Sequence, residues 1–154
     1  MGLLLGVALA SLGLDLASKW LAARFLQDEV IRLGWLVHLE CTKNTGMAFG
    51  MMAGNVAANL LLPLAVILAG ALLMRHYRST AFTRTACGLI LGGFVGNFAQ
   101  RLVQGYVLDM IYFPWLPFFV CNVADICICF GVALLAFSLL LRPQDWEEKK
   151  HAEN

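Results

Sequence analysis

Apolar residues are concentrated in four long runs along the chain, and most polar residues fall between them. The runs cover about residues 3–23, 56–74, 85–103 and 121–141. Each approaches the roughly 20 apolar residues that a helix needs to cross the hydrocarbon core of a bilayer. The pattern predicts an all-α membrane protein in which four transmembrane helices form a bundle. Because the runs and their connectors use up the 154 residues, we expect a single domain over residues 1–154.

The connector after the first run has a different pattern. Residues 30–39 have the composition of strands interrupted by Gly34, and the polar cluster Asn44-Thr45-Gly46 is typical of a turn. We therefore expect a small β-sheet within residues 30–52 that lies on the outer surface of the membrane.

The connector before the fourth run is rich in aromatic side chains. Residues 106–120 contain Pro114 and Pro117, so this segment is too short and too kinked to span a bilayer. Aromatic residues collect at the membrane–water interface. We expect an interfacial loop here.

Composition narrows the range of functions. The chain is 60% hydrophobic and 14% charged, its mean hydropathy is +0.76, and its net charge is +1, with no basic stripe for nucleic acid. The cysteines form no CxxC pair and the three histidines are scattered, so these residues favour packing over a metal site. We expect no metal, no cofactor and no nucleic-acid partner.

Lysines and arginines in short loops indicate the cytoplasmic side of a membrane protein. The connector between the second and third runs and the C-terminal tail are both basic, through Arg75, Arg78, Arg84, Arg142, Lys149 and Lys150. We expect both termini in the cytoplasm and the connectors 24–55 and 104–120 outside, although 24–55 also holds three basic residues.

Two aspartates lie where carboxylates are unfavourable. Asp125 falls inside the fourth run, and Asp109 follows the third run closely. An acid at the centre of a transmembrane helix costs about 2.5–3.5 kcal/mol, so it is taken as functional and needs a partner. Two carboxyls in a low-dielectric site share a proton, as in an aspartic protease. Buried acids in small membrane proteins also form proton pathways.

Other polar residues are spaced so that they share helix faces. Asp15 and Lys19 are four residues apart in the first run, which either helps that helix insert or braces a site. Their presence, and the absence of a preceding Lys or Arg, predict that the first run is retained rather than cleaved as a signal peptide. Three further sets share faces or allow close helix packing: Asn97 with Arg101, Asn122 with Asp125, and Gly92-Gly93 with Gly96.

Five short segments occur in a characteristic order. Residues 15–19 (DLASK), 44–49 (NTGMAF), 92–101 (GGFVGNFAQR), 107–111 (VLDMI) and 122–125 (NVAD) resemble the patterns DxxSK, NxGxAF, GGxxGNxxDR, VxDFI and FNxAD. In this order over about residues 10–130, they are similar to the motifs of the lipoprotein signal peptidases, also called type II or prolipoprotein signal peptidases.

The resemblance implies an aspartic endopeptidase of the bacterial inner membrane. Such an enzyme removes the signal peptide of a prolipoprotein just before the cysteine that carries a diacylglyceryl group. Its partners would be this lipidated substrate and membrane lipid, and we expect a monomer. Carried over, Asp109 and Asp125 are the catalytic dyad, and the stretch 24–52 corresponds to the extracytoplasmic β-cradle of the family. The residues that line, support or brace the site are Asn44, Gly46, Asn97, Gln100, Arg101, Asn122, Ala124, Asp15 and Lys19.

The chain departs from the family pattern at two positions. Gln100 stands where the pattern has an acid, and Cys121 stands where Phe is usual. Gln cannot neutralise Arg101, so either another carboxylate lies near the arginine or the site is tuned differently. The change at Cys121 indicates altered packing.

Two other classes of function compete with a peptidase. A proton-coupled transporter would use the buried acids as relay sites, but the two similar halves typical of transporters are missing. A non-catalytic assembly or lipid-binding protein would keep the packing glycines but would not need both Asp109 and Asp125.

Overall fold

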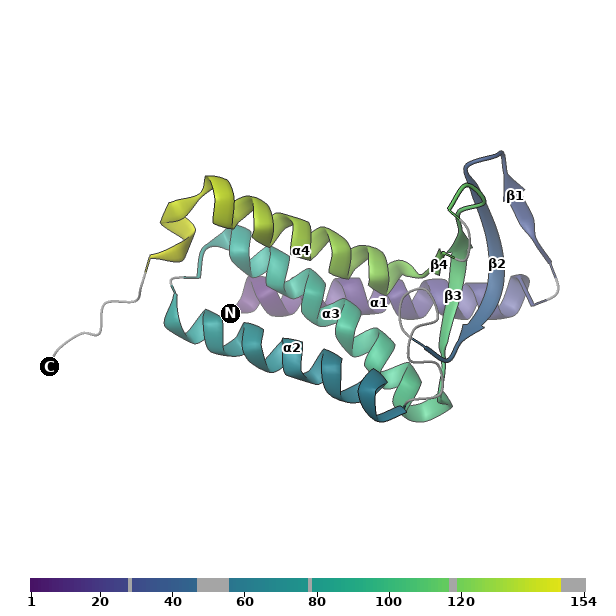
Figure 1. Cartoon of the computed structure of the whole chain (residues 1–154), viewed down its shortest axis with the longest axis horizontal. Helices are drawn as coiled ribbons and strands as arrows, with labels where there is room; N and C mark the ends of the chain where they lie inside the picture. The colour runs from purple at the N-terminus through teal and green to yellow at the C-terminus, as the bar shows by residue number, and fades with distance from the viewer. Residues whose placement is uncertain (28, 47–55, 78, 117–118, 148–154) are drawn as a thin grey trace, which may run out of the picture.

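Four long helices lie alongside one another, and a small sheet closes one end of them (Figure 1). The computed structural model describes residues 1–27, 29–46, 56–77, 79–116 and 119–147. The helices are α1 (Gly2–Phe25), α2 (Val56–His76), α3 (Ala81–Gln104) and α4 (Val123–Leu141), and the one-turn 3-10 helix η2 (Pro143–Trp146) follows α4.

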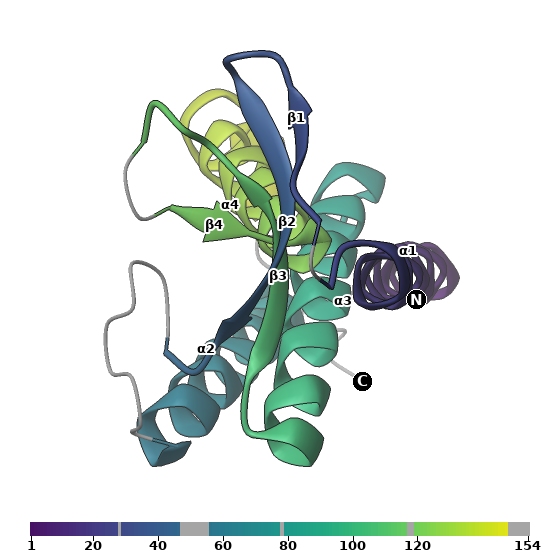
Figure 2. The same cartoon turned by 90° about the vertical axis from the view of Figure 1, so that its right-hand side faces the viewer.

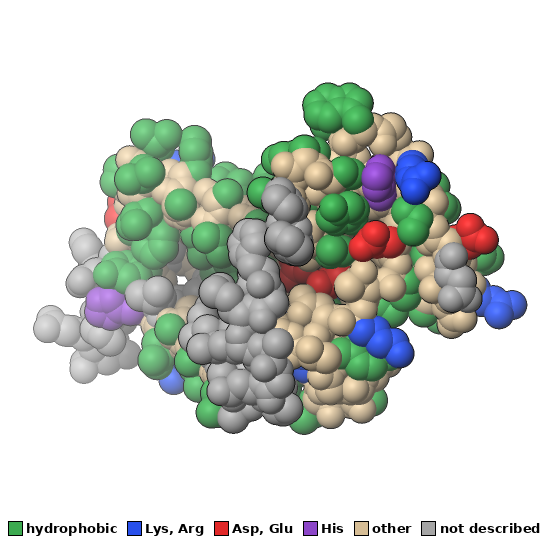
Figure 3. Space-filling model, turned by 45° about the vertical axis from the view of Figure 1, so that its right-hand side comes forward, with side chains coloured by type: hydrophobic (Ala, Val, Ile, Leu, Met, Phe, Trp, Pro, Cys, Tyr) green, Lys and Arg blue, Asp and Glu red, His purple; other side chains and the backbone are tan. Residues whose placement is uncertain are grey.

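Within the described residues, α1, α3 and α4 are long and apolar enough to cross a membrane. The expected membrane-helix architecture is confirmed to this extent, and α2 coincides with the remaining predicted run. Many large apolar side chains of α1 and α4 point outward, among them Leu9, Leu140 and Phe130. Figure 3 shows a largely hydrophobic surface over the helices, whereas most charged side chains on this face lie toward the sheet.

Glycines on α3 allow the helices to approach closely. Gly88, Gly92 and Gly96 recur every fourth residue and lie against α1, and a Cβ on Gly88 would come within 2.8 Å of the Leu4 carbonyl oxygen. On the other side, a Cβ on Gly93 would lie 2.5 Å from the Ala124 carbonyl oxygen of α4. Small residues permit this backbone approach in membranes, where packing rather than hydrophobic burial drives helix association. The small-residue spacing therefore predicted a real contact surface.

The sheet has four antiparallel strands in the order β1-β2-β3-β4. They are β1 (Ile31–Leu33), β2 (Val37–Asn44), β3 (Val107–Tyr112) and β4 (Val120–Cys121). Gly34 lies in the turn between β1 and β2 with a φ of 75°, a conformation that favours glycine. Figure 2 shows the sheet seen from the end of the helices.

The predicted sheet is present, but the prediction missed two of its strands. The segment 106–120, expected to be an interfacial loop, supplies β3 and β4, and β3 pairs with β2 over most of its length. Pro114 lies beyond the end of β3, so it does not interrupt the hydrogen-bonded ladder, and Pro117 lies outside the described residues. Cys121 belongs to β4 and Asn122 caps the helix, so α4 begins at Val123, slightly later than the predicted start at about residue 121.

A small apolar cluster fixes the sheet against the helices. Leu108 and Met110 of β3 pack with Ala22 and Leu26 at the end of α1. Successive side chains of a strand point to opposite faces. Asp109, between Leu108 and Met110, therefore points away from this cluster.

Candidate active site

The start of α4 positions Asp125. Asn122 is the N-cap residue, and its Oδ1 accepts the Asp125 N–H at 3.0 Å. In return, the Asn122 backbone N–H donates to Asp125 Oδ2 at 3.1 Å. This reciprocal capping box is a local consequence of an Asn followed three residues later by an acid. The positive end of the helix dipole favours the carboxylate at this position.

Asp109 is brought to the same place by strand β3. Its side chain is buried, with Oδ1 accepting Asn122 Nδ2–H at 2.6 Å and Oδ2 accepting Asn44 Nδ2–H at 2.9 Å. Asn44 is the last residue of β2, which pairs with β3. Asn122 therefore contacts both aspartates, and the expected partnership of Asp109 and Asp125 is realised through this shared asparagine.

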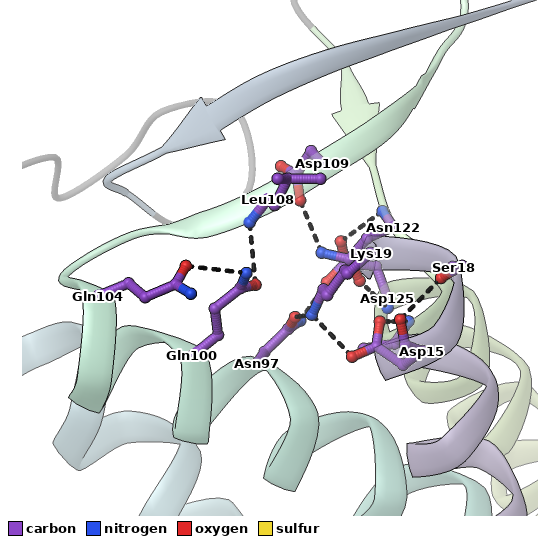
Figure 4. A network of polar contacts seen from close by, with 11 residues as sticks. Asp15, Ser18, Lys19, Asn97, Gln100, Gln104, Leu108, Asp109, Asn122 and Asp125 are labelled. Atoms are coloured by element: carbon purple, nitrogen blue, oxygen red, sulfur yellow. Dashed lines mark hydrogen bonds and ion pairs between the residues drawn. The ribbon is translucent and has the colours of Figure 1, made fainter. Parts of the chain in front are cut away.

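A buried ion pair on α1 supports Asp125 from the other side (Figure 4). Lys19 Nζ donates to Asp15 Oδ2 at 2.7 Å and to Asn97 Oδ1 at 2.8 Å. Asn97 Nδ2 then donates to Asp125 Oδ1 at 2.8 Å. Asp15 Oδ1 also accepts the backbone N–H of Ala124 at 3.0 Å. The sequence predicted the ion pair, but its two links to α3 and α4 depend on helix packing.

Three asparagine amides are locked in orientation. The amide oxygens of Asn44, Asn97 and Asn122 each accept from a group that can only donate: the Gly46 backbone N–H, the Lys19 ammonium and the Asp125 backbone N–H. Their NH₂ groups must therefore face the carboxylates. All four carboxylate oxygens of the two aspartates therefore accept N–H donors.

Burial dominates the electrostatics of Asp109. Its pKa is raised from 3.8 to about 6, and the largest cause is the loss of solvent, because the charged form is disfavoured in a low-dielectric site. The hydrogen bonds from Asn44 and Asn122 and the positive charge of Lys19 lower this pKa, whereas the negative charge of Asp125 raises it. The carboxyl can therefore hold a proton at a much higher pH than an exposed aspartate does.

Arg101 lies at the edge of the same network. Its Nη2 donates to the carbonyl oxygen of Gly46 at 2.8 Å, and its charge interacts with both Asp125 and Asp109. Its Nε is buried and has no hydrogen-bond partner in the described part of the chain. Asp109 and Asp125 are thus carboxylates close enough to Arg101 to act on its charge, as in the first of the two alternatives raised for the glutamine at position 100.

Gln100 has a partner that sequence reasoning missed. Its Oε1 accepts the backbone N–H of Leu108 at 3.0 Å, and its Nε2 donates to Gln104 Oε1 at 3.2 Å. The structure therefore connects every residue predicted for the site either directly to the network or, for Gln100, to the residue beside Asp109. Among the described residues, no group of three or more His, Cys, Asp or Glu is arranged to hold a metal ion.

Comparison with known proteins gives the family. A family model described as signal peptidase (SPase) II matches residues 7–141. The chain belongs to the signal peptidase II family. The lipoprotein signal peptidase of Symbiobacterium thermophilum is 35% identical over 141 residues, which cover 88% of this chain and 92% of the relative. That of Yersinia pestis (strain Pestoides F) is 36% identical over 144 residues, covering 84% of this chain and 82% of the relative.

Solved structures agree on the fold of this signal peptidase II chain. A bacterial membrane enzyme determined by the in meso method at 2.3 Å resolution superposes with a TM-score of 0.82 at 22% identity, covering 98% of this chain and 95% of that one. A second such structure, at 1.9 Å resolution, gives 0.79 at 21% identity, covering 92% and 95%. The resemblance found in the five sequence motifs is confirmed.

Proposed function

We propose that this chain is a bacterial membrane endopeptidase that removes signal peptides from prolipoproteins, with Asp109 and Asp125 as an aspartic catalytic dyad. Membership of the signal peptidase II family supports the reaction. A single observation supports the aspartic catalytic type: Asn122 forms hydrogen bonds with both Asp109 and Asp125 at one end of the helix bundle.

The reaction needs the pair of carboxyls to hold one proton. The ionised carboxyl takes a proton from water as the water oxygen bonds to the scissile carbonyl carbon, and the protonated carboxyl gives its proton to the carbonyl oxygen. When the C–N bond breaks, a proton passes to the leaving amine. Neighbouring carboxyls of unequal environment perform this acid–base work.

The locked amides keep this pair in place. Each of Asn44, Asn97 and Asn122 gives a neutral N–H to a carboxylate, so it fixes geometry without bringing a charge that would remove the shared proton. Lys19 and Arg101 add positive charge near the dyad, which favours one ionised carboxyl. In this proposal Arg101, whose Nε has no hydrogen-bond partner among the described residues, also binds a substrate carbonyl oxygen.

The location of the dyad fits a substrate that lies in a membrane. Asp125 lies in the first turn of α4 and Asp109 on the sheet that closes this end of the helices, so neither is at mid-depth of the helices. A signal helix in the bilayer beside α4 would present its scissile bond at this boundary, next to the diacylglyceryl cysteine whose chains stay among the lipid tails.

The same proposal includes the arrangement in the bacterial inner membrane. Helix α2 is the fourth transmembrane span, and the chain is one integral-membrane domain that acts as a monomer. Both termini lie in the cytoplasm, and the sheet lies on the outer side of the membrane. Arg75 near the end of α2 and Arg84 near the start of α3 support this orientation, because basic residues favour the cytoplasmic side.

The test is cleavage of a diacylglyceryl-modified prolipoprotein, and of its unmodified form, by purified enzyme in lipid vesicles. We expect cleavage of the modified form only. Asp109→Asn and Asp125→Asn should each abolish it, and the double variant should be no worse than either single variant because the two carboxyls act as a unit.

Asp145→Asn is the matched control. Asp145 is buried as Asp109 is, and it is ion-paired with Arg142, but it lies in η2, at the opposite end of the bundle from the sheet. We expect it to keep its activity per folded molecule. More than a few per cent of wild-type activity in either dyad variant would contradict the catalytic assignment.

A further inference from the structure

Strand β3 has an edge that β4 does not cover. β4 is two residues long and pairs only with Ile111 and Tyr112. Residues 107–110, which include the proposed catalytic Asp109, are all buried. Buried backbone N–H groups require acceptors. Beyond the end of β4, the acceptor for the Leu108 N–H is a side chain of α3, Gln100 Oε1, at 3.0 Å.

The orientation of the Gln100 amide follows from this contact. A backbone N–H can only donate, so the amide oxygen must face Leu108 and the NH₂ group must face away. The NH₂ group donates to Gln104 Oε1, one turn further along α3, at 3.2 Å. Figure 4 shows Gln100 between Gln104 and the backbone of β3.

Two residues on one face of α3 therefore contact Asp125 and the strand that carries Asp109. Asn97 bonds directly to the Asp125 carboxylate, and Gln100, three residues later, bonds to the residue that precedes Asp109. Residues three apart lie on the same side of a helix. The same turn of α3 therefore contacts both the Asp125 carboxylate and the β3 backbone, and it helps to set the distance between them.

We propose that Gln100 is a positioning residue that fixes Asp109 relative to Asp125 by acting as the hydrogen-bond acceptor for β3. This inference rests on the proposed function, since it assumes that the two aspartates react together. The amide does this without charge, so the Gln100–Leu108 hydrogen bond persists across the pH range in which the dyad titrates. It also leaves Arg101 free to interact with the dyad.

Three variants distinguish this positioning role from a role in fold stability alone and from a role that does not depend on the acceptor oxygen. Gln100→Met keeps the length of the side chain but removes the acceptor. Gln100→Glu keeps an acceptor oxygen at the same distance. Gln104→Leu, the matched control, changes an exposed neighbour on the same helix that does not contact β3 in the described hydrogen bonds. Cleavage of lipid-modified prolipoprotein is measured on the pH plateau of each enzyme.

We expect Gln100→Met to lower kcat about 10- to 100-fold with KM changed less than about twofold, because a displacement of roughly 1 Å in a catalytic group has effects of this size. Gln100→Glu and Gln104→Leu should stay within about threefold of wild type, since neither removes the acceptor. Amide exchange at Leu108, followed by NMR of ¹⁵N-leucine-labelled protein, should be slow in wild type and about tenfold faster in Gln100→Met.

Several results would overturn the proposal. Fast exchange at Leu108 in wild type would show that the hydrogen bond is absent, whether or not Gln100→Met can be purified. A lower thermal midpoint for Gln100→Met with unchanged kcat would mean that Gln100 only stabilises the fold. An equal loss of kcat in Gln100→Glu would show that the acceptor is not what matters. If wild type did not cleave the substrate, the proposed function would fail, and Leu108 exchange would still test the contact.

Discussion

Gly96 of α3 lies against Asp15 of α1, which supports the candidate site, and Gly96→Ala tests whether that contact controls activity. A Cβ at this residue would lie 2.5 Å from Asp15 Oδ2, although ordinary contact begins at 3.4 Å. That oxygen has little freedom, because it is held by Lys19 Nζ at 2.7 Å and the other carboxylate oxygen accepts the Ala124 N–H. The methyl group must therefore push α1 away or displace the Asp15–Lys19 pair.

Either response alters the support of Asp125. Lys19 orients Asn97, which in turn donates to the Asp125 carboxylate. Overpacking of this kind destabilises by about 1–3 kcal/mol, against a gain of roughly 1 kcal/mol from replacing Gly by Ala in a helix. We expect a net loss of about 0–2 kcal/mol in unfolding free energy. Since displacements approaching 1 Å change rates by up to about 100-fold, we expect kcat to fall about 10- to 100-fold.

The assay compares prolipoprotein cleavage and thermal unfolding in detergent with those of Gly13→Ala. Gly13 lies inside α1, but a Cβ there meets nothing within 4 Å. This control should keep full activity and gain about 0.5–1 kcal/mol from its helix propensity. If Gly96→Ala matched Gly13→Ala in both activity and stability, α1 and α3 would not be tightly apposed at the site, and the bracing role of the ion pair would be refuted.

Three further predictions concern charge and topology. Carboxyl ¹³C NMR should show Asp109 titrating near pH 6, and Asp125→Asn should lower this midpoint because it removes a negative charge that raises the pKa; a midpoint near 4 would contradict its burial. Gln100→Asp should keep measurable activity, although its shorter side chain weakens the contact with Leu108, and it should shift the acid limb of the pH–rate profile upward, since a new negative charge raises the pKa of Asp109. An unchanged profile would show that position 100 is electrically remote from the two aspartates. With the other cysteines replaced, a membrane-impermeant thiol reagent should label Cys41 in spheroplasts, whereas labelling of Ser79→Cys would reverse the topology.

Features that depend on short spacings were predictable from the sequence. Runs of apolar residues indicated the long helices, and the four-residue spacing of Asp15 and Lys19 indicated an ion pair on one turn. Asn122 and Asp125 indicated a shared helix face, and the structure shows that they form a capping box. These features follow from the 3.6-residue period of the helix, which makes residues three or four apart neighbours whatever the rest of the fold does.

The five ordered motifs also indicated which residues belong to one site, but not which atoms meet. Asn97 was grouped with Arg101 on a helix face, yet its amide lies between Lys19 and Asp125. Gln100 was considered only as a neighbour of Arg101, although its acceptor atom serves the backbone of β3. A short sequence does not reveal such partners, because each amide can donate and accept in several directions.

Only the tertiary structure decided how the two carboxyls come together. Segment 106–120 looked like a loop because β3 gains its strand partner from β2, about 65 residues earlier in the chain, as in the Asn44–Asp109 contact. The hydrogen bond between Ala124 and Asp15 joins residues 109 positions apart. Contacts of this kind exist only after glycine-mediated helix packing and strand pairing have closed long loops. Local periodicity fixes the direction of a side chain on its own element, whereas the packing of elements determines what that side chain meets.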